Sequence, residues 1–211
     1  MLSAAAELRE AEALGGADAG GAAGAGTALI GGTESMSQAP LAVYGADVRF
    51  GHRMGTDMKL LDTLWAGLTD SHCATAMGAT AENVADVHGV DRAACDAYAA
   101  RSQAAWAAAQ ARGAFAAELA PVPLPPAKRG GAPGACAVDE HPRPDTTAAS
   151  LAKLPTLFRK EGGRVTAGSA SGICDGAAAL VIATGAAVQR RGFKPLARVV
   201  AWAAAGVDPK L

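Results

Sequence analysis

The sequence predicts an α/β fold in which a long, mostly helical segment separates two apolar strands. A first apolar run, residues 27–30, leads into two glycines. A second apolar run closes the stretch VTAGSASGICDGAAALVIAT, residues 165–184. Between these runs, apolar side chains recur at helical rather than alternating spacing. Together these patterns favour one sheet that is interrupted by a large helical insertion.

The residues around the first strand are irregular. Residues 2–14 are rich in Ala and Glu and predict a helix. Residues 15–26 hold only Gly, Ala and one Asp, so we interpret them as a flexible insertion. Residues 27–30 predict a buried strand that ends in a tight turn at Gly31 and Gly32. Residues 33–40 are rich in turn-forming side chains.

Two helices are predicted in the first part of the intervening segment. Residues 57–68 place five apolar side chains on one helical face: Met58, Leu61, Leu64, Trp65 and Leu68. Residues 80–88 predict a second helix, with Thr80 as its N-cap and Gly89 as its stop.

The longest predicted helix, residues 91–112, is capped by Asp91 and ended by Gly113. A proline- and glycine-rich connection follows it. Residues 148–154 predict a short helix that Pro155 halts.

Beyond the second strand, residues 186–191 predict a helix that Gly192 ends, and residues 196–202 predict a further strand.

Composition excludes several classes of function. The net charge of −1 and the 4% aromatic content argue against a nucleic-acid partner. The four cysteines and four histidines are scattered without metal-ligand spacing, which argues against a zinc site and a disulfide framework. No apolar run is as long as a membrane span. The beginning of the sequence lacks the apolar centre of a signal peptide.

The stretch of small residues within 165–184 is the first candidate site. A nucleophile elbow requires G-x-S-x-G, but the central position of GSASG is Ala170. Cys174 has no histidine nearby in sequence to act as its base, so we interpret it as a packed small residue. The glycine motifs of phosphate loops are absent from the stretch. Two alternatives stay open: a loop that contacts an extended polar ligand, and a plain tight turn.

Three charged residues in loops are further candidates. Arg143 lies between Pro142 and Pro144, which stiffen the loop and suit its guanidinium to a phosphate or carboxylate. The alternative is a solvated loop charge. Glu34 and Asp175 lie beside glycines and are interpreted as structural hydrogen-bond acceptors.

Five blocks resemble the thiolases, the acetyl-CoA acyltransferases of fatty-acid and acetoacetyl-CoA metabolism. They are GGTESMSQAP (31–40), TAEN (80–83), DEHPRPDTT (139–147), VTAGSASGICDGAAAL (165–180) and GVDPK (206–210). Their order and approximate spacing also match. The resemblance implies two similar α/β halves with a loop domain inserted in the first half. Residues 1–39 and 172–194 would belong to the first half, residues 40–171 to the loop domain, and residues 195–211 to the opening strand of the second half.

The resemblance also implies site residues. Arg143 and Ser150 match positions that contact the nucleotide end of coenzyme A. Ala170 and Ser171 match positions that contact its pantetheine arm, and Met77 matches a residue that lines the acyl pocket. Coenzyme A and acyl-CoA would be substrates, and no permanently bound cofactor or metal is implied. Thiolases are commonly dimers or tetramers, and the expected compartment is the cytoplasm or the mitochondrial matrix.

The catalytic motifs of the resembled family are not found in these 211 residues. They are C-x-S-G for the nucleophilic cysteine, and G-H-P and C-x-G-G-G for the acid, base and oxyanion groups. We therefore assign no catalytic residue and expect an internal piece of a thiolase that is inactive by itself. The alternative is a non-catalytic coenzyme A-binding or interaction module.

Overall fold

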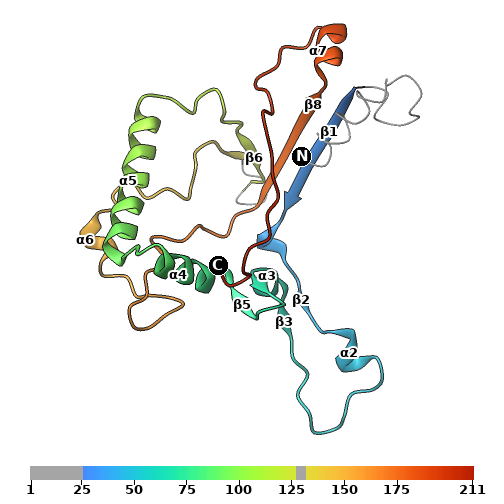
Figure 1. Ribbon diagram of the computed structural model, residues 1–211, viewed down its shortest axis with the longest axis vertical. Helices are drawn as coiled ribbons and strands as arrows, with labels where there is room; N and C mark the ends of the chain where they lie inside the picture. The colour runs from blue at the N-terminus through green and yellow to red at the C-terminus, as the bar shows by residue number, and fades with distance from the viewer. Residues whose placement is uncertain (1–25, 127–131) are drawn as a thin grey trace. The chain divides into compact units, whose positions relative to one another are not determined.

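The computed structural model describes residues 26–126 and 132–211 of the chain (Figure 1). The chain divides into two compact units, Met1–Leu64 with Ile173–Val207, and Trp65–Gly172 with Asp208–Leu211. The second unit thus interrupts the first in sequence. The helix expected over residues 2–14 and nearly all of the insertion expected over 15–26 lie outside the described residues.

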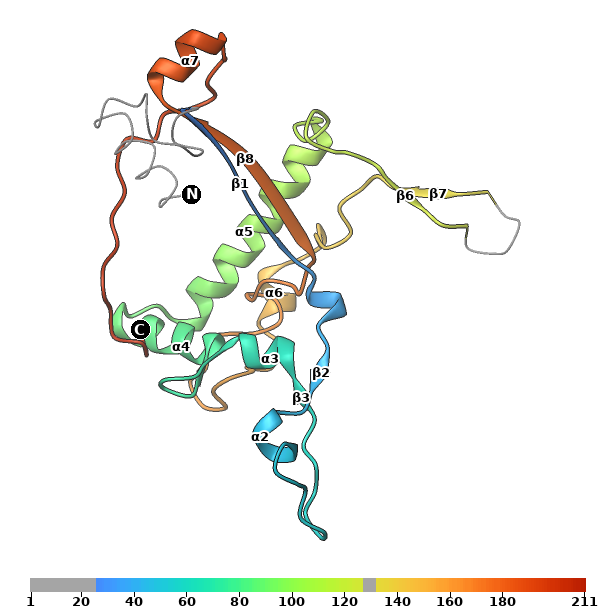
Figure 2. The same cartoon turned by 90° about the vertical axis from the view of Figure 1, so that its right-hand side faces the viewer.

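The first unit contains two antiparallel strands from distant parts of the sequence. β1 (Thr27–Glu34) pairs with β8 (Gly176–Ala183) over its whole length. Figures 1 and 2 show the two strands side by side. Just beyond the paired residues, the backbone N–H and the hydroxyl of Ser37 donate to the Asp175 carboxylate at 2.9 and 2.6 Å. The interpretation of Asp175 as a structural acceptor is confirmed.

Gly31 and Gly32 continue β1, so the prediction of a turn at these glycines was wrong. Each lies opposite an alanine of β8, and a Cβ on Gly31 would come within 3.0 Å of the Ala178 carbonyl oxygen. Glycine therefore permits a close approach of the two backbones. The predicted burial was also wrong, because Leu29 is 77% exposed and Val181, its partner in the register, is 65% exposed.

Local hydrogen bonds replace most of the helix predicted over residues 57–68. A short 3-10 helix (Met36–Gln38) precedes the pair of β2 (Leu41–Ala42) and β3 (Leu61–Asp62), and α2 (Gly45–Val48) lies between those strands. Only α3 (Thr63–Gly67) is helical in the predicted range. The Thr63 hydroxyl donates to the Pro40 carbonyl at 2.6 Å, and the Asp62 carboxylate accepts from the Leu64 N–H at 2.9 Å. Strand pairing and these side-chain bonds outcompete the helical pattern.

The second unit includes a hairpin followed by a helix. β4 (Thr69–Asp70) pairs with β5 (Thr75–Ala76), and α4 (Met77–Val87) follows at once. The Asp70 carboxylate accepts from two consecutive N–H groups, those of His72 and Cys73, both at 2.8 Å. α4 begins earlier than the predicted cap at Thr80, because the Met77 N–H donates to the Leu68 carbonyl at 3.0 Å. It ends before Gly89, whose φ of +61° confirms the predicted stop.

The longest helix confirms its prediction. α5 (Arg92–Ala111) begins at Asp91, whose carboxylate accepts from the Ala94 N–H at 2.7 Å, and it ends before Gly113 at φ +71°. The connection after it contains a hairpin that the sequence did not predict, formed by β6 (Val122–Leu124) and β7 (Gly134–Cys136).

α6 (Ala148–Leu151) is shorter than its predicted range of 148–154. The Arg92 guanidinium donates to the carbonyls of Leu151 and Leu154 at 2.7 and 3.0 Å, which ties the end of α6 to α5. Arg92 also pairs with Asp96 one turn along α5, at 2.9 Å.

The chain after β8 only partly follows its prediction. α7 (Gly185–Arg191) is capped by the Thr184 hydroxyl and ends at Gly192, whose φ is +65°. The strand predicted over residues 196–202 was wrong, because no described strand pairs with this segment. An extended segment without a partner leaves its backbone groups to water. Within the described residues, no helix is long and apolar enough to cross a membrane.

The Asp175–Ser37 contact predicts acid sensitivity of the first unit. The hydroxyl and the N–H of Ser37 hold the pKa of Asp175 below its usual value of 3.8. A lowered folded-state pKa gives stability that is present above pH ~4 and lost as the pH falls through the folded-state pKa. The melting temperature of Asp175→Asn should therefore lie below that of the wild type at pH 6 and converge with it as the pH falls through the folded-state pKa of Asp175. Parallel melting curves at every pH would contradict this role.

The exposed side chains of β1 and β8 predict self-association. Leu29 and Val181 form one apolar cross-strand pair open to solvent, and patches of this kind promote aggregation. We expect the purified chain to scatter light as multimers, and the double variant Leu29→Lys, Val181→Lys to associate less. A monodisperse wild-type monomer with a cooperative melt would contradict the expectation.

Candidate functional site

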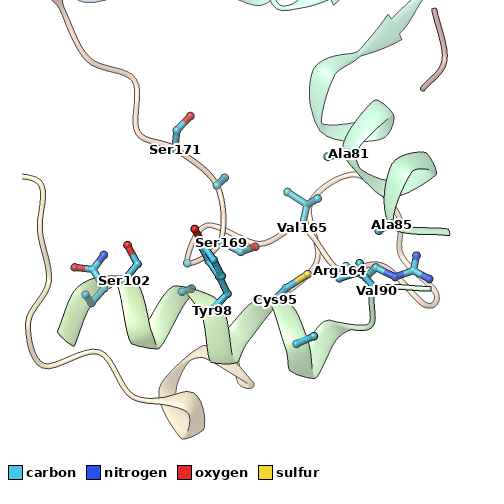
Figure 3. Close-up of a pocket in the computed structure, with 15 residues that line it drawn as sticks. Ala81, Ala85, Val90, Cys95, Tyr98, Ser102, Arg164, Val165, Ser169 and Ser171 are labelled. Atoms are coloured by element: carbon cyan, nitrogen blue, oxygen red, sulfur yellow. The ribbon is translucent and has the colours of Figure 1, made fainter. Parts of the chain in front are cut away.

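A hollow of about 590 Å³ lies within the second unit, between α4, α5 and the loop of residues 164–171. Figure 3 shows Ala81 and Ala85 on α4, Cys95, Tyr98 and Ser102 on α5, and Ser169 and Ser171 on the loop. Most lining side chains are small, and the polar ones come from α5 and the loop. The site therefore combines an alanine-rich wall with hydroxyl and backbone groups.

The 164–171 loop folds around Thr166, which is fully buried. The Thr166 hydroxyl accepts from the Gly168 N–H at 3.2 Å, and the Thr166 backbone N–H donates to the Ser169 hydroxyl at 3.0 Å. The Ala170 N–H donates to the Thr166 carbonyl at 3.0 Å. A Cβ on Gly168 would overlap the side chain of Leu151, so only glycine fits there. The loop is thus a tight turn that also lines a hollow.

A second hollow of about 430 Å³ is formed around the proline-flanked arginine. Its lining residues are Pro142, Arg143, Pro144, Asp145, Thr146 and Ser150. The Arg143 backbone N–H donates to the Gln103 side-chain oxygen at 2.8 Å, and the Arg143 carbonyl accepts from the Thr146 hydroxyl at 2.7 Å. Within the described residues, the Arg143 guanidinium makes no ion pair or hydrogen bond. Its backbone is therefore fixed while its charge is available to an anion.

The structure thus groups four of the five predicted site residues in two places. Ala170 and Ser171 line the first hollow, and Arg143 and Ser150 line the second. Met77 lines neither, and its side chain is 65% exposed at the start of α4. Ser150 has a structural task as well, because its hydroxyl accepts from the Thr147 N–H at 3.1 Å in a capping box of α6.

Gln103 is a site residue that the sequence did not reveal. Its side chain lines the first hollow and holds the Arg143 backbone in the second, so it joins the two. Tyr98 and Ser102 are four residues apart on one face of α5, and this helical spacing is the signal that could have indicated them. The segment just after the 164–171 loop also lies close to the segment just before Arg143, because a Cβ on Gly172 would overlap the His141 ring.

Cys95, which lines the first hollow, and Cys174, the cysteine of the 165–184 stretch, differ in environment. Burial raises the pKa of the Cys95 thiol, and the charges of Asp96 and Glu82 add to the rise. Cys95 is therefore a neutral thiol in the wall of the hollow, not an activated nucleophile. Cys174 is exposed in the first unit, so its interpretation as a packed residue was wrong. It lies just before β8, whose first six residues are exposed.

A charged network lies behind the first hollow. Glu82, 1% exposed on α4, accepts from the backbone N–H groups of Arg164 and Val165. The Arg164 guanidinium lies 2.7 Å from Asp86, which also pairs with Arg159 at 2.7 Å. Hydrogen bonds from Arg159 and then Arg164 hold the pKa of Asp86 below its usual value. Among the described residues, no group of three His, Cys, Asp or Glu side chains could hold a metal ion.

The chain matches proteins of one family. The model of the thiolase N-terminal domain matches residues 19–186. The mitochondrial 3-ketoacyl-CoA thiolase of Mus musculus is 51% identical over 183 residues, which are 87% of this chain and 45% of that protein. An acetyl-CoA acetyltransferase of Pseudomonas aeruginosa is 42% identical over 198 residues, covering 93% of this chain and 49% of that protein. The chain spans about half the length of these curated relatives.

Solved structures agree with the sequence matches. The crystal structure of human mitochondrial 3-ketoacyl-CoA thiolase superimposes with a TM-score of 0.76 at 48% identity, covering 87% of this chain and 45% of that one. The same enzyme in complex with CoA superimposes with a TM-score of 0.69 at 49% identity, covering 81% and 40%. These neighbours establish a thiolase-like α/β fold. Because one family model, close relatives and solved structures all agree, the chain belongs to the thiolase family.

Proposed function

We propose that this chain is the coenzyme A-holding part of a thiolase that transfers an acyl group between coenzyme A and a 3-ketoacyl-CoA. One observation carries the proposal: two hollows, joined by Gln103, gather the residues expected at the two ends of coenzyme A. The described complex of a human relative with CoA supports this choice of ligand.

Each hollow suits a different part of the ligand. The Arg143 guanidinium has no partner among the described residues and lies beside Ser150. It is suited to the phosphates of the nucleotide end, since guanidinium binds phosphate through directed, charge-assisted hydrogen bonds. The Gly168–Ser171 backbone offers a close approach to the amide-bearing pantetheine arm, with the Ser171 hydroxyl at the rim. Met77, at the exposed start of α4, is assigned to the acyl pocket by family likeness alone.

The two-unit division supports a loop domain inserted in the first α/β half. The divisions at 64/65 and 172/173 suggest an insert that begins later than the expected residue 40 and ends near the expected residue 171. The assignment of residues 195–211 to a second half, the dimer or tetramer, and the cytoplasmic or mitochondrial compartment stay predictions.

Calorimetry with coenzyme A tests the ligand assignment. The wild-type chain should bind coenzyme A, and Arg143→Ala should weaken binding about tenfold or more, because a charge-assisted contact is lost. Arg112→Ala is the matched control: it also removes one positive charge from the second unit, but Arg112 caps the end of α5 and lines neither hollow. Equal affinities of the wild type and Arg143→Ala would refute the role of Arg143.

A thiolysis assay separates the thiolase piece from the alternative of a non-catalytic binding module. The absence of C-x-S-G, G-H-P and C-x-G-G-G from these 211 residues favours binding without turnover. We expect no 3-ketoacyl-CoA thiolysis above background from the chain alone, even at coenzyme A concentrations that saturate it. Turnover in a chain extended by segments that carry all three motifs would favour the thiolase piece, whereas substantial turnover by the chain alone would sink the claim of inactivity.

A further inference from the structure

Glu82 is a buried carboxylate that bonds to another segment rather than to its own helix. It lies in the middle of α4 and is 1% exposed. Its Oε1 accepts from the N–H groups of Arg164 and Val165, both at 2.8 Å, and its Oε2 accepts from the Arg164 N–H at 3.0 Å. One carboxylate thus binds two consecutive backbone amides at the start of the 164–171 loop.

Positive charges behind the carboxylate offset its burial. The Arg164 Nη1 lies 3.6 Å from Glu82 Oε2 and 2.7 Å from Asp86 Oδ1. The Arg159 guanidinium holds Asp86 at 2.7 Å from the other side. A buried charge is tolerated only where opposite charge and hydrogen bonds compensate its desolvation. The network therefore places a guanidinium beside the buried Glu82 carboxyl at the start of the loop.

The geometry of the loop follows from this anchor. Two consecutive amides on one carboxylate fix the backbone at Arg164 and Val165. Buried Thr166 comes next and bonds to Gly168 and Ser169, while Gly168 packs against Leu151. Ala170 and Ser171 then line the hollow. A loop without the anchor would sample more backbone conformations, and only a fraction of them would present Ala170 and Ser171 to a ligand.

We propose that Glu82 is a positioning residue for coenzyme A, because it holds the 164–171 loop in the conformation that receives the pantetheine arm. The inference rests on the proposed function, but it adds a residue that contacts no ligand itself. An apolar residue of similar size would fill the same space in α4. It could not orient two amides, so packing alone does not explain a carboxylate there.

The test compares Glu82→Gln with a matched control, Asp70→Asn. Asp70 also accepts from two consecutive amides of the second unit, but it acts in the β4–β5 hairpin and lines neither hollow. The glutamine keeps the shape of Glu82 and one acceptor oxygen, and it turns an N–H₂ donor towards the Arg164 donors. Both variants would be titrated with three probes well below their melting temperatures: coenzyme A, pantetheine, and the nucleotide half of coenzyme A.

The proposal predicts a pattern across the probes. Glu82→Gln should weaken the binding of coenzyme A and of pantetheine about tenfold. This loss is expected if the 164–171 loop adopts its binding conformation in about one tenth of the molecules. Its affinity for the nucleotide half should match the wild type, since Arg143 and Ser150 are untouched. Hydrogen exchange at the amides of Arg164 and Val165 should accelerate by about tenfold or more, and Asp70→Asn should change neither affinity nor exchange there.

Contrary outcomes are distinguishable. A wild-type chain that binds none of the probes overturns the proposed function, while the exchange data still report on the anchor. Unchanged coenzyme A affinity in Glu82→Gln overturns the positioning role alone. An equal loss of affinity for all three probes in both variants would also overturn the positioning role, because it would indicate only reduced stability. Should Glu82→Gln not fold, Glu82→Asp, which keeps the charge on a shorter side chain, carries the same expected pattern and decides.

Discussion

The antiparallel pairing of β1 with β8 is the constraint on which the rest of the chain depends. It brings Glu34 opposite Gly176, so every residue between them must leave and return at one end of the strand pair. The entropic cost of closing a loop rises only with the logarithm of its length, so a long excursion costs little more than a short one. The Ser37–Asp175 bonds close the excursion at its base. What lies between is then free to form its own compact unit.

That second unit depends on long polar side chains because its helices are poor in large apolar ones. Among the described residues of that unit, the buried hydrophobic side chains are Ala85, Ala109 and Leu151. Arg92 and Glu82 supply the connections that larger apolar residues make in other folds. Arg92 binds carbonyls at the end of α6 and just after it, and Glu82 binds amides at the start of the 164–171 loop. Directional bonds of this kind specify backbone position more sharply than contact between small methyl groups does.

Sequence predictions succeeded where a local signal acts alone. Asp91 and Gly113 bound α5, and Gly192 ends α7, because caps and left-handed glycines work within one turn of chain. They failed where a distant partner decides. Residues 61–62 have a helical pattern but pair with β2, and residues 196–202 have a strand pattern but no described partner. Gly31 was predicted to form a turn, whereas it allows the β1 backbone to approach β8, a strand that lies far along the chain.

The residues of the candidate site also divide into those that a local sequence signal indicates and those that depend on distant partners. Proline stiffening indicated Arg143 from local sequence, and the run of small residues indicated the loop that holds Ala170 and Ser171 as one of two alternatives, whereas Ser150 was indicated only by family resemblance. Glu82 was visible within TAEN, but its partners lie more than 80 residues away, and the sequence offered no reason to connect them. Gln103 was missed for the same reason, since its side chain on α5 bonds to the Arg143 backbone 40 residues along the chain.

The two prolines around Arg143 have a consequence for how an anion is recognised there. Proline has no N–H, so the Pro142–Pro144 segment offers one backbone donor, and Gln103 already occupies it. The segment therefore cannot form a nest of amides around a phosphate. Attraction must come from the side-chain charge alone, which acts over distance but is screened by dissolved ions. At the proposed pantetheine end, the turn at 166–170 would act by close contact rather than by charge, so salt should weaken one end of the proposed site and spare the other.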